Sequence, residues 1–388
     1  MNILYVLNTT IETDGANKSF FQLAKSLKNQ GHNLWVAVPS RTGISYTLEA
    51  LGVHILQAPI RPAIYPDCRN AFYTIFFLAR LLYWQILNHY AHKKLMGLLK
   101  NIKIDIVHSN VSIIDTGYKI AKKLQCPHIY HIREYGEKDF NMHYFPTRNI
   151  YWEKMHKKDS YCICITKDIM KYDNLSYANS RVIYNGIYPS SCIIKNSSKK
   201  KYFLYAGRIQ QAKGVFELVK AYCEYASKRE EPMKLIIIGR VVDNNYYKKV
   251  LKYIKQRNMN CHIIVKEPIN DIAILMREAT AIIIPSIQEG FGRCMAEAMF
   301  NDCLVIGKNT AGTKEQFDNG YAYTGEEIGL RYTQNKDLTN ILEFVSSHDP
   351  NYFIEYKERA RKTILHYYTT EKYIESVENF YKYIIKNK

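Results

Sequence analysis

The chain has 388 residues, of which 47% are hydrophobic and 23% charged, so it can bury full hydrophobic cores and is not a disordered protein. This length exceeds what one core fills, and two domains are expected. Lys and Arg outnumber Asp and Glu by 54 to 36, and residues 1–200 hold 26 of the basic but only 13 of the acidic residues. Such a charge attracts nucleic acid, an anionic membrane or a phosphorylated substrate.

The nine cysteines form no Cys-x-x-Cys pair, which indicates reduced thiols and a reducing compartment. The first residues, MNILYVLNTTIETDG, lack a basic stretch followed by a long apolar one, so we expect a cytoplasmic protein without a signal peptide. The most apolar long segment, residues 71–87, contains Arg80 and is shorter than the roughly 20 residues of a membrane-spanning helix. We expect a helix there, either in the core of the first domain or in the headgroup region of an anionic bilayer.

Short apolar runs alternate with helical periodicity along both halves of the chain. The runs of the first half are NILYVL, LWVAVP, VHILQA, IDIVHSN, PHIYHIRE and YCICITKDI. After a turn-rich and Lys/Ser-rich stretch near residues 186–200, the pattern restarts with YFLYAG, KLIIIG, CHIIV, AIIIP and CLVIG. Strands separated by helices predict a parallel sheet that is covered on both faces.

The sequence therefore predicts an α/β protein with two Rossmann-like, doubly wound domains that face a central cleft, where such sheets bind ligands. We expect the first domain at residues 1–188, a linker at 189–200 and the second domain at 201–365. We expect residues 366–388 to form a helix that packs back on the N-terminal domain.

The stretch IIIPSIQEGFGRCMAEAMF ends a strand, turns at two glycines and enters a helix. Glu289 precedes this helix and Glu297 lies within it, on a side away from its apolar face. Gly290 and Gly292 let backbone approach a ligand closely, and the helix N-terminus offers N–H groups to a phosphate. Because a carboxylate accepts two hydrogen bonds, each glutamate suits a sugar diol. Taken alone, either glutamate is equally consistent with an ordinary solvated charge.

A second motif, YAGRIQQAKGVFELVKA, places Arg208 just after a strand and Lys213 just before a helix. Two cations at a strand-to-helix junction can clamp a pyrophosphate, the arginine as a fork and the lysine as a point charge. The alternative is a pair of surface cations beside a loop.

Together these motifs resemble the retaining glycosyltransferases of family 4, whose two Rossmann-like domains form the GT-B fold, and among them the bacterial enzymes of cell-surface polysaccharide synthesis. The resemblance covers nearly the whole chain and rests on PSIQEGFGRCMAEAM, GRIQQAKG, VIYNGI and GANKSFFQLAKSLKNQGH. It implies a metal-independent transferase, without a cofactor, that moves a hexose from a nucleotide-diphosphate sugar, by expectation a UDP sugar. The acceptor would be a glycan or a polyprenyl-diphosphate-linked sugar for capsule, O-antigen or exopolysaccharide, bound on the N-terminal side. Contact with an anionic membrane at its inner face is expected from the apolar segment.

The resemblance also implies roles for single residues of the second, donor-binding domain. Arg208 and Lys213 would neutralise the diphosphate leaving group. Glu289 would bind the transferred sugar, and Glu297 the ribose hydroxyls. The remaining donor contacts would come from the backbone of both domains, at Gly290, Phe291, Gly292, Gly15 and Ala16.

In the first domain, the resemblance implies that His131 in HIYHIREY approaches the sugar, with His108 as a competitor for this position. Arg133 and Glu134 follow on the same rim and are candidates for acceptor contacts. The predicted strand places His128 and His131 on opposite faces, and no Asp-x-Asp motif is present, so we predict no metal site.

Two positions depart from the family pattern: Arg240 in IIIGRVVD stands where many relatives have a Gly-x-Gly turn, and Ala311 in AGTKE replaces the first of two glycines. Two other functions fit parts of the sequence. One is a sugar-nucleotide epimerase of the same fold, which needs no acceptor. The other is a basic nucleic-acid-binding protein, although no RNP, KH or zinc-finger pattern is present.

Overall fold

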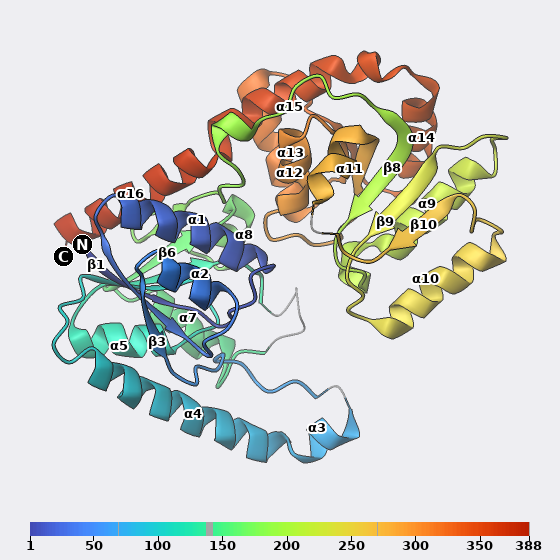
Figure 1. Cartoon of the computed structure of the whole chain (residues 1–388). Coiled ribbons are helices and arrows are strands. Elements are labelled where there is room, and N and C mark those ends of the chain that lie inside the picture. Colours follow the sequence, from blue (N-terminus) through green and yellow to red (C-terminus); the bar gives the residue numbers. More distant parts are fainter. Residues whose placement is uncertain (69, 137–142, 270, 388) are drawn as a thin grey trace. The chain divides into compact units, whose positions relative to one another are not determined.

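The computed structural model describes residues 1–68, 70–136, 143–269 and 271–387. The chain divides into two compact units: unit 1 consists of Met1–Gly186 and Thr370–Lys388, and unit 2 of Ile187–Thr369. Each unit is an open parallel sheet with helices packed on it (Figure 1). These two Rossmann-like units confirm the predicted α/β fold class. All nine cysteines are free thiols.

The sheet of unit 1 has the strand order β3-β2-β1-β4-β5-β6-β7 in the part of the chain that is described. Its strands are β1 (Asn2–Val6), β2 (Asn33–Val38), β3 (His54–Gln57), β4 (Ile106–Ser109), β5 (His128–Ile132), β6 (Ser160–Cys164) and β7 (Ser180–Val182). Its helices are α1 (Gly15–Asn29), α2 (Ile44–Ala50), α3 (Ala71–Ile75), α4 (Phe77–Leu98), α5 (Thr116–Leu124), α7 (Arg148–Met155), α8 (Lys167–Tyr172) and α16 (Thr370–Lys386). All six predicted strands are present, and β7 is a short edge strand that the sequence did not predict.

The sheet of unit 2 has the strand order β10-β9-β8-β11-β12-β13, counted over the described residues. Its strands are β8 (Lys200–Ala206), β9 (Lys234–Ile238), β10 (Ile263–Lys266), β11 (Ala279–Ile284), β12 (Leu304–Lys308) and β13 (Leu330–Tyr332). Its helices are α9 (Val215–Ala226), α10 (Asn244–Gln256), α11 (Ile272–Glu278), α12 (Arg293–Phe300), α13 (Ala311–Thr324), α14 (Asn335–Ser347) and α15 (Ile354–Tyr367), with short 3-10 turns η1 (Ser190–Cys192), η2 (Gln211–Lys213) and η3 (Pro350–Phe353). The five predicted strands are present, and β13 again adds an unpredicted edge strand.

Both sheets reverse their strand order near the middle. The reversal lies between β1 and β4 in unit 1, and between β8 and β11 in unit 2. At such a point, the loops after the two strands diverge and leave a crevice at the carboxyl edge of the sheet. In unit 2 these loops are residues 207–214 and 285–292, which contain both predicted donor-binding motifs.

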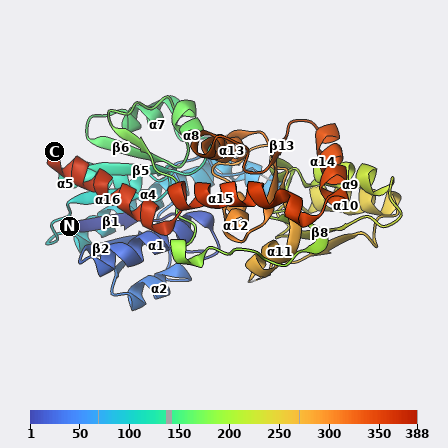
Figure 2. The ribbon, with the colours of Figure 1, turned by 90° about the horizontal axis from the view of Figure 1, so that it is seen from above.

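Helix α16 returns the C-terminus to unit 1, where it runs beside α1 in Figure 1 and Figure 2. Its apolar residues Val377, Phe380 and Ile384 are buried in the unit 1 core. The sequence predicted that the C-terminal helix begins at residue 366, whereas the boundary between the two units follows Thr369. The predicted linker, residues 189–200, belongs to unit 2.

The apolar segment at residues 71–87 forms α3 and the first part of α4, as predicted, but it is not a core helix. Only Asn88, Ala91 and Leu95 of α4 are buried. Among the helices that the structure describes, none is both long and apolar enough to cross a bilayer.

Candidate active site

The two loops at the carboxyl edge of the unit 2 sheet pack backbone against backbone. The amide of Ile287 donates to the carbonyl of Ala212 at 3.0 Å. Gly214 has a φ of +68°, and a Cβ at this position would lie 2.1 Å from the carbonyl oxygen of Pro285. Only glycine satisfies both the conformation and the close approach. Lys213, the residue before Gly214, is thereby held against the second loop.

Lys213 forms an ion pair with Glu289, the acidic residue of that second loop. The lysine Nζ lies 2.5 Å from the glutamate Oε2. The two side chains are 14% and 21% exposed, respectively, so both remain accessible to a ligand. The structure thus brings together the predicted phosphate-binding lysine and the predicted sugar-binding glutamate.

Helix α12 carries a second ion pair, which links Arg293 in its first turn to Glu297 in its second. The guanidinium nitrogen lies 3.3 Å from the carboxylate oxygen, and the side chains are 20% and 15% exposed. On the opposite side, Phe291, Met295 and Ala298 are buried. The predicted separation of an apolar and a polar face is therefore confirmed. The arginine partner of Glu297 was not predicted, although its position four residues earlier is a recognisable helical ion-pair spacing.

Cys294 is close enough to both ion pairs for their charges to act on its thiol. Its thiol donates to the carbonyl of Ala206, at the end of β8, at 3.2 Å. Burial raises the pKa of Cys294, and the negative charges of Glu297 and Glu289 act in the same direction. The thiol therefore stays protonated and neutral between the two carboxylates. Nothing in the sequence pattern singled out this cysteine.

Arg208 follows β8 at the same edge and is half-buried. Its carbonyl accepts a hydrogen bond from the hydroxyl of Tyr205 at 2.8 Å. Burial raises the pKa of Tyr205, Glu289 raises it further, and Arg208 opposes this shift. Arg208 and Glu289 therefore both act electrostatically on the Tyr205 hydroxyl.

The start of α13 fixes the backbone of the Glu289 loop. The amide of Gly312 donates to the carbonyl of Glu289 at 2.9 Å. A Cβ at Gly312 would lie 2.7 Å from that carbonyl oxygen and 2.8 Å from the carbonyl oxygen of Phe291. The side chain of Gln316 donates to the carbonyl of Gly292 at 3.0 Å. These contacts hold the loop in one conformation while leaving the Glu289 carboxylate to its cation.

The two departures from the family pattern lie beside this site. Arg240 is exposed after β9, and its carbonyl accepts from the amide of Ile209 at 2.9 Å. Ala311 has a φ of +47°, in the left-handed region that favours glycine. At Ala311 the backbone thus keeps a conformation that a glycine would adopt more easily.

Gly15 and Ala16, the predicted phosphate contacts of unit 1, form the first turn of α1. Asp14 is the N-cap residue, its side chain makes no capping hydrogen bond, and the first turn contains no acidic residue. The side chain of Asn110 donates to the carbonyl of Ala16 at 3.4 Å. This helix N-terminus lies at the carboxyl edge of the unit 1 sheet, where the strand order reverses.

His131 lies inside β5 and has no exposed surface. Its Nδ1 is 3.1 Å from Nε2 of His108, which is also fully buried. Burial and then the charge of Arg133 lower the pKa of His131 well below its usual value, so the ring is neutral. His128 lies on the other face of the strand, beside Ser109 at 2.9 Å. The role of His131 toward the sugar stays a prediction, and the structure places this ring in the interior.

Arg133 is the first residue after β5 and is 9% exposed. Its guanidinium donates to the carbonyl of Asn110 at 2.9 Å and to Oδ1 of Asn185 at 2.7 Å. A third contact, at 3.3 Å, joins it to the hydroxyl of Tyr373 on α16. The sequence indicated Arg133 as a rim residue but not its attachment to the C-terminal helix.

The unit 2 site combines a reversal of strand order, two glycine loops and a partly exposed pair of lysine and glutamate side chains. In the part of the chain that the structure describes, no three His, Cys, Asp or Glu side chains lie together as a candidate metal site. Fold and site together are those of a class of proteins that have two Rossmann-like units and bind a ligand at the carboxyl edge of a parallel sheet.

Comparison with known families specifies this class. Residues 13–191 match the family described as Glycosyltransferase Family 4, and residues 193–361 match Glycosyl transferases group 1. The chain therefore belongs to the glycosyltransferases with the GT-B fold.

Individual relatives are distant. The chain is 24% identical over 235 residues to an uncharacterized glycosyltransferase of Methanocaldococcus jannaschii, covering 60% of this chain and 63% of that protein. It is 25% identical over 165 residues to the O-antigen chain mannosyltransferase RfbU of Salmonella typhimurium, covering 42% and 45%. The chain thus matches less than two thirds of the length of either relative. The crystal structure of HepE from Anabaena in complex with UDP-glucose has a TM-score of 0.72 at 16% identity, and 98% of each chain is covered. This similarity confirms the GT-B fold.

Proposed function

We propose that the protein transfers a hexose from a nucleotide-diphosphate sugar to a glycan or lipid-linked acceptor, with retention of the anomeric configuration. The observation that carries this proposal is the ion pair between Lys213 and Glu289. It places a cation suited to a diphosphate 2.5 Å from a carboxylate suited to sugar hydroxyls, at the point where the sheet reverses.

The relatives favour the choice of substrates. HepE, which shares the fold, was crystallised with UDP-glucose, and RfbU is an O-antigen mannosyltransferase. HepE supports a UDP sugar as donor, and RfbU supports a product that belongs to a cell-surface polysaccharide such as capsule, O-antigen or exopolysaccharide. We place the enzyme in the cytoplasm, at the inner face of the membrane.

Cleavage of the anomeric bond builds positive charge on the sugar and negative charge on the departing diphosphate. Stabilising the leaving group is therefore the main catalytic task. In our proposal Arg208 and Lys213 neutralise the diphosphate, helped by the N-terminal N–H groups of α12 and by Gly15 and Ala16 of α1. Glu289 binds the hydroxyls of the transferred sugar. In this proposal the two cations neutralise the diphosphate, as a divalent metal does in metal-dependent glycosyltransferases, so the reaction uses no metal and no cofactor.

We propose front-face attack for the transfer itself. The acceptor oxygen forms its bond to the anomeric carbon on the side from which the diphosphate departs, and a leaving phosphate oxygen takes the acceptor proton. Arg133 and Glu134 are the candidates for acceptor contact in unit 1, and His131 for a contact to the sugar. An NMR spectrum showing a product of inverted anomeric configuration would contradict this mechanism.

Binding of the donor requires an exchange of partners. Glu289 is paired with Lys213 and Glu297 with Arg293, so each carboxylate of the site already has a cation. The diphosphate attracts the cations, and the sugar and ribose hydroxyls attract the carboxylates. Because all four side chains keep some exposure, each pair costs little to open, about 0.2–1 kcal/mol.

A thermal-shift panel of nucleoside diphosphates and their sugars tests the proposal. A ligand that binds only the folded protein stabilises it, by about 2.7 kcal/mol at a ligand concentration of 100 times the Kd, and thereby raises the unfolding midpoint. We expect one nucleotide and its sugar to give the largest shift, and Glu297→Ala to abolish it. Glu343→Ala is the control: Glu343, on α14, forms a more exposed ion pair with Lys228, and its loss should leave the shift unchanged.

The sugar nucleotide that gives the largest shift can then distinguish a transferase from an epimerase. A transferase consumes it in an acceptor-dependent reaction, whereas an epimerase changes the sugar of the nucleotide without an acceptor. A panel in which no nucleotide raises the midpoint would remove the basis of the proposal.

A further inference from the structure

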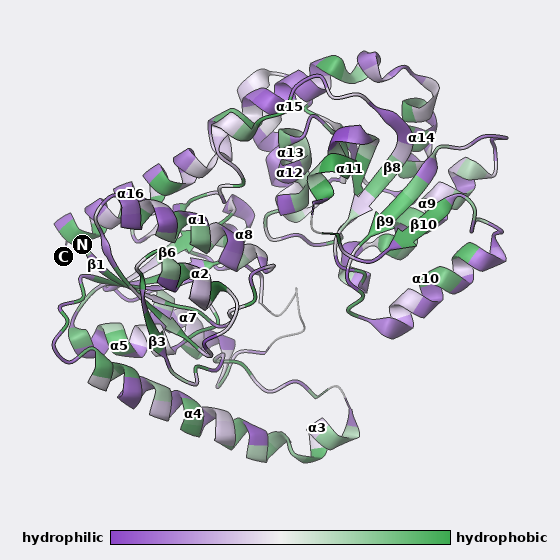
Figure 3. Cartoon of the chain, viewed as in Figure 1, coloured by the Kyte–Doolittle hydropathy of each residue, from purple (hydrophilic) through white to green (hydrophobic). Residues whose placement is uncertain are grey.

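Helix α4 carries a row of uncovered apolar side chains. Leu78, Leu82, Ile86 and Tyr90 follow one another at intervals of four residues, which places them on one face of the helix. Their side chains are 75%, 63%, 56% and 55% exposed, respectively. Figure 3 shows hydrophobic residues along this helix, which lies at the outer edge of unit 1 in Figure 1.

The opposite face of α4 is anchored to unit 1. Asn88, Ala91 and Leu95 are buried at helical spacing. Oδ1 of Asn88 accepts a hydrogen bond from the amide of Arg61 at 2.8 Å. The rotation of the helix about its axis is therefore fixed by packing, and the exposed row points away from the rest of unit 1.

Helix α3 extends this apolar surface. Phe72, Ile75 and Phe76 are 62%, 76% and 47% exposed. The guanidinium of Arg80 stacks over the ring of Tyr73 at 4.4 Å. A single exposed apolar side chain is ordinary, but a contiguous group of this kind marks an interaction surface.

Lysines lie at the other end of the row. The interval of four continues from Tyr90 to Lys94, and Lys93 is exposed beside it. Helix α5 packs on α4 and adds exposed Lys122 and Lys123. Burial and then the charge of Lys119 lower the pKa of His92, a residue of α4, and Lys123 adds to the effect. Lysines of α5 therefore act on His92, the α4 residue that precedes Lys93.

This surface has no negative charge of its own. Residues 68–104 contain no Asp or Glu. Within the described ranges, Lys93, Lys94, Lys122 and Lys123 form no salt bridge. The cations next to the apolar row thus have no partner from the same segment, and they suit a negatively charged surface.

We propose that this docking face, formed by Leu78, Leu82, Ile86, Tyr90, Lys93 and Lys94, binds the surface of an anionic lipid bilayer. The apolar row enters the boundary between headgroups and acyl chains, and the lysines contact lipid phosphates. From Leu78 to Lys94 the row is about 24 Å long, so the helix lies along the membrane. A second copy of the chain is a poorer occupant, because its own segment 68–104 brings no carboxylate to the lysines. The role of this docking rests on the proposed function, because it would bring a lipid-linked acceptor within reach of the transferase.

Cosedimentation with lipid vesicles tests the proposal on the full chain. We expect binding at low salt to vesicles of phosphatidylcholine mixed with phosphatidylglycerol, and weaker binding to phosphatidylcholine alone. Ile86→Asp should reduce binding at least tenfold. Ile274→Asp is the matched control, because Ile274 is 49% exposed on α11 and Ile86 56% exposed on α4, and it should bind like the unchanged protein.

The lysines are tested with a charge-matched pair of variants. Lys93→Glu with Lys94→Glu should weaken binding to the anionic vesicles by about 10- to 30-fold or more, from the usual attraction of two lysines near such a surface. Lys248→Glu with Lys252→Glu on α10 changes the net charge equally, at exposed positions in unit 2. This control should keep most of the binding.

Three results would overturn the proposal. The first is that the unchanged protein does not sediment with anionic vesicles, and the second is that Ile86→Asp and Ile274→Asp lose vesicle binding equally. The third is that the protein does not bind vesicles but forms a dimer that Ile86→Asp dissociates. The thermal shift with nucleotides, measured without lipid, reports on folding and on the donor site of each variant. If the protein gives a normal nucleotide shift but does not bind vesicles, the docking face is rejected and the proposed function stands. If it binds vesicles but no nucleotide shifts its midpoint, the transferase proposal is rejected.

Discussion

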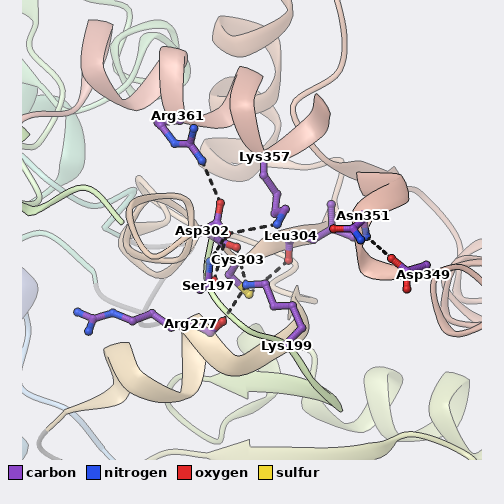
Figure 4. Close-up of polar contacts among 10 residues, drawn as sticks. All are labelled: Ser197, Lys199, Arg277, Asp302, Cys303, Leu304, Asp349, Asn351, Lys357 and Arg361. Carbon is purple, nitrogen blue, oxygen red and sulfur yellow. Dashed lines mark hydrogen bonds and ion pairs between the residues drawn. The ribbon is translucent and has the colours of Figure 1, made fainter. Parts of the chain in front are cut away.

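Helix α12 has a cluster of carboxylates and cations at each end, and the two clusters are built differently. At its N-terminal end, Glu289 and Glu297 each pair with one cation and remain 21% and 15% exposed. After its C-terminal end, the side chain of Asp302 is only 1% exposed and lies 3.2 Å from Lys357 and 3.1 Å from Arg361 (Figure 4). The first cluster can exchange its partners for those of a ligand, whereas the second is enclosed by protein.

The enclosed cluster also takes in the chain segment before β8. The amide and the hydroxyl of Ser197 both donate to the Asp302 carboxylate at 3.1 Å. The Lys199 ammonium donates to the Asp302 carbonyl at 2.6 Å. One carboxylate therefore joins this segment, the turn after α12 and helix α15. We therefore propose that the N-terminal cluster serves ligand binding and that the C-terminal cluster serves stability.

The largest effect is expected from Asp302→Ala. It leaves two cations without their buried carboxylate, and we expect the free energy of unfolding to fall by about 3–5 kcal/mol. Urea denaturation measures the change. Asp318→Ala is the control: its side chain is 43% exposed and paired with Arg331, and its loss should cost less than about 1 kcal/mol. Equal losses in the two variants would contradict the assignment of a structural role to Asp302.

Lys213→Ala should act on turnover rather than on stability. Removing one group that stabilises the developing charge costs about 10²- to 10³-fold in rate, and we expect this loss in the consumption of donor sugar. Binding of the nucleoside part should change much less. Lys248→Ala, at an exposed position of α10, is the control. A parallel fall in the unfolding midpoint would show that the first cluster is structural after all.

Acid should weaken the second cluster. Burial alone would raise the pKa of Asp302, but Lys357, the Ser197 amide and Lys199 outweigh it and hold the pKa below its ordinary value of 3.8. A carboxyl with a lowered pKa contributes its stability above the unfolded pKa and loses it as the pH falls through the folded pKa. The stability difference between the unchanged protein and Asp302→Asn should thus be constant from neutral pH to about pH 5 and shrink below 3.8. A difference that grows in acid would refute this account.

The smallest effect is expected from Glu289→Gln. The amide keeps the shape of the side chain but releases Lys213 from its ion pair. We expect a free nucleoside diphosphate to bind about two- to fivefold more tightly, as the loss of a pair worth 0.2–1 kcal/mol allows, while turnover of the donor sugar falls. Titration calorimetry measures the affinity, with Glu278→Gln as a control on the pair with Lys200. Weaker diphosphate binding would disprove the proposed exchange of partners.

The central strands and the donor loops were predictable because local signals specify them. Apolar runs bounded by turns predicted the inner strands, and the glycines of EGFG and AKG predicted the loops that carry Glu289 and Lys213. The edge strands β7 and β13 were missed because each has only three residues and takes its conformation from a neighbouring strand.

Features that depend on contacts between distant residues could not be predicted. Periodicity showed that α4 is a helix, but its exposure depends on which elements of unit 1 leave it uncovered. The interior position of His131 follows from its place within β5 and from its contact with His108 on the neighbouring strand β4. The burial of the Cys294 thiol against the carbonyl of Ala206 results from the meeting of β8 and α12, which no local sequence pattern shows.

The return of α16 to unit 1 has a consequence for the synthesis of the protein. Unit 2 is a continuous stretch, Ile187–Thr369, but unit 1 lacks part of its core until Thr370–Lys386 has been made. That last helix supplies the hydroxyl of Tyr381, 2.6 Å from both Tyr5 and His108, so it joins the first strand to the final residues. On the ribosome, the half that is translated first is thus the half that is completed last.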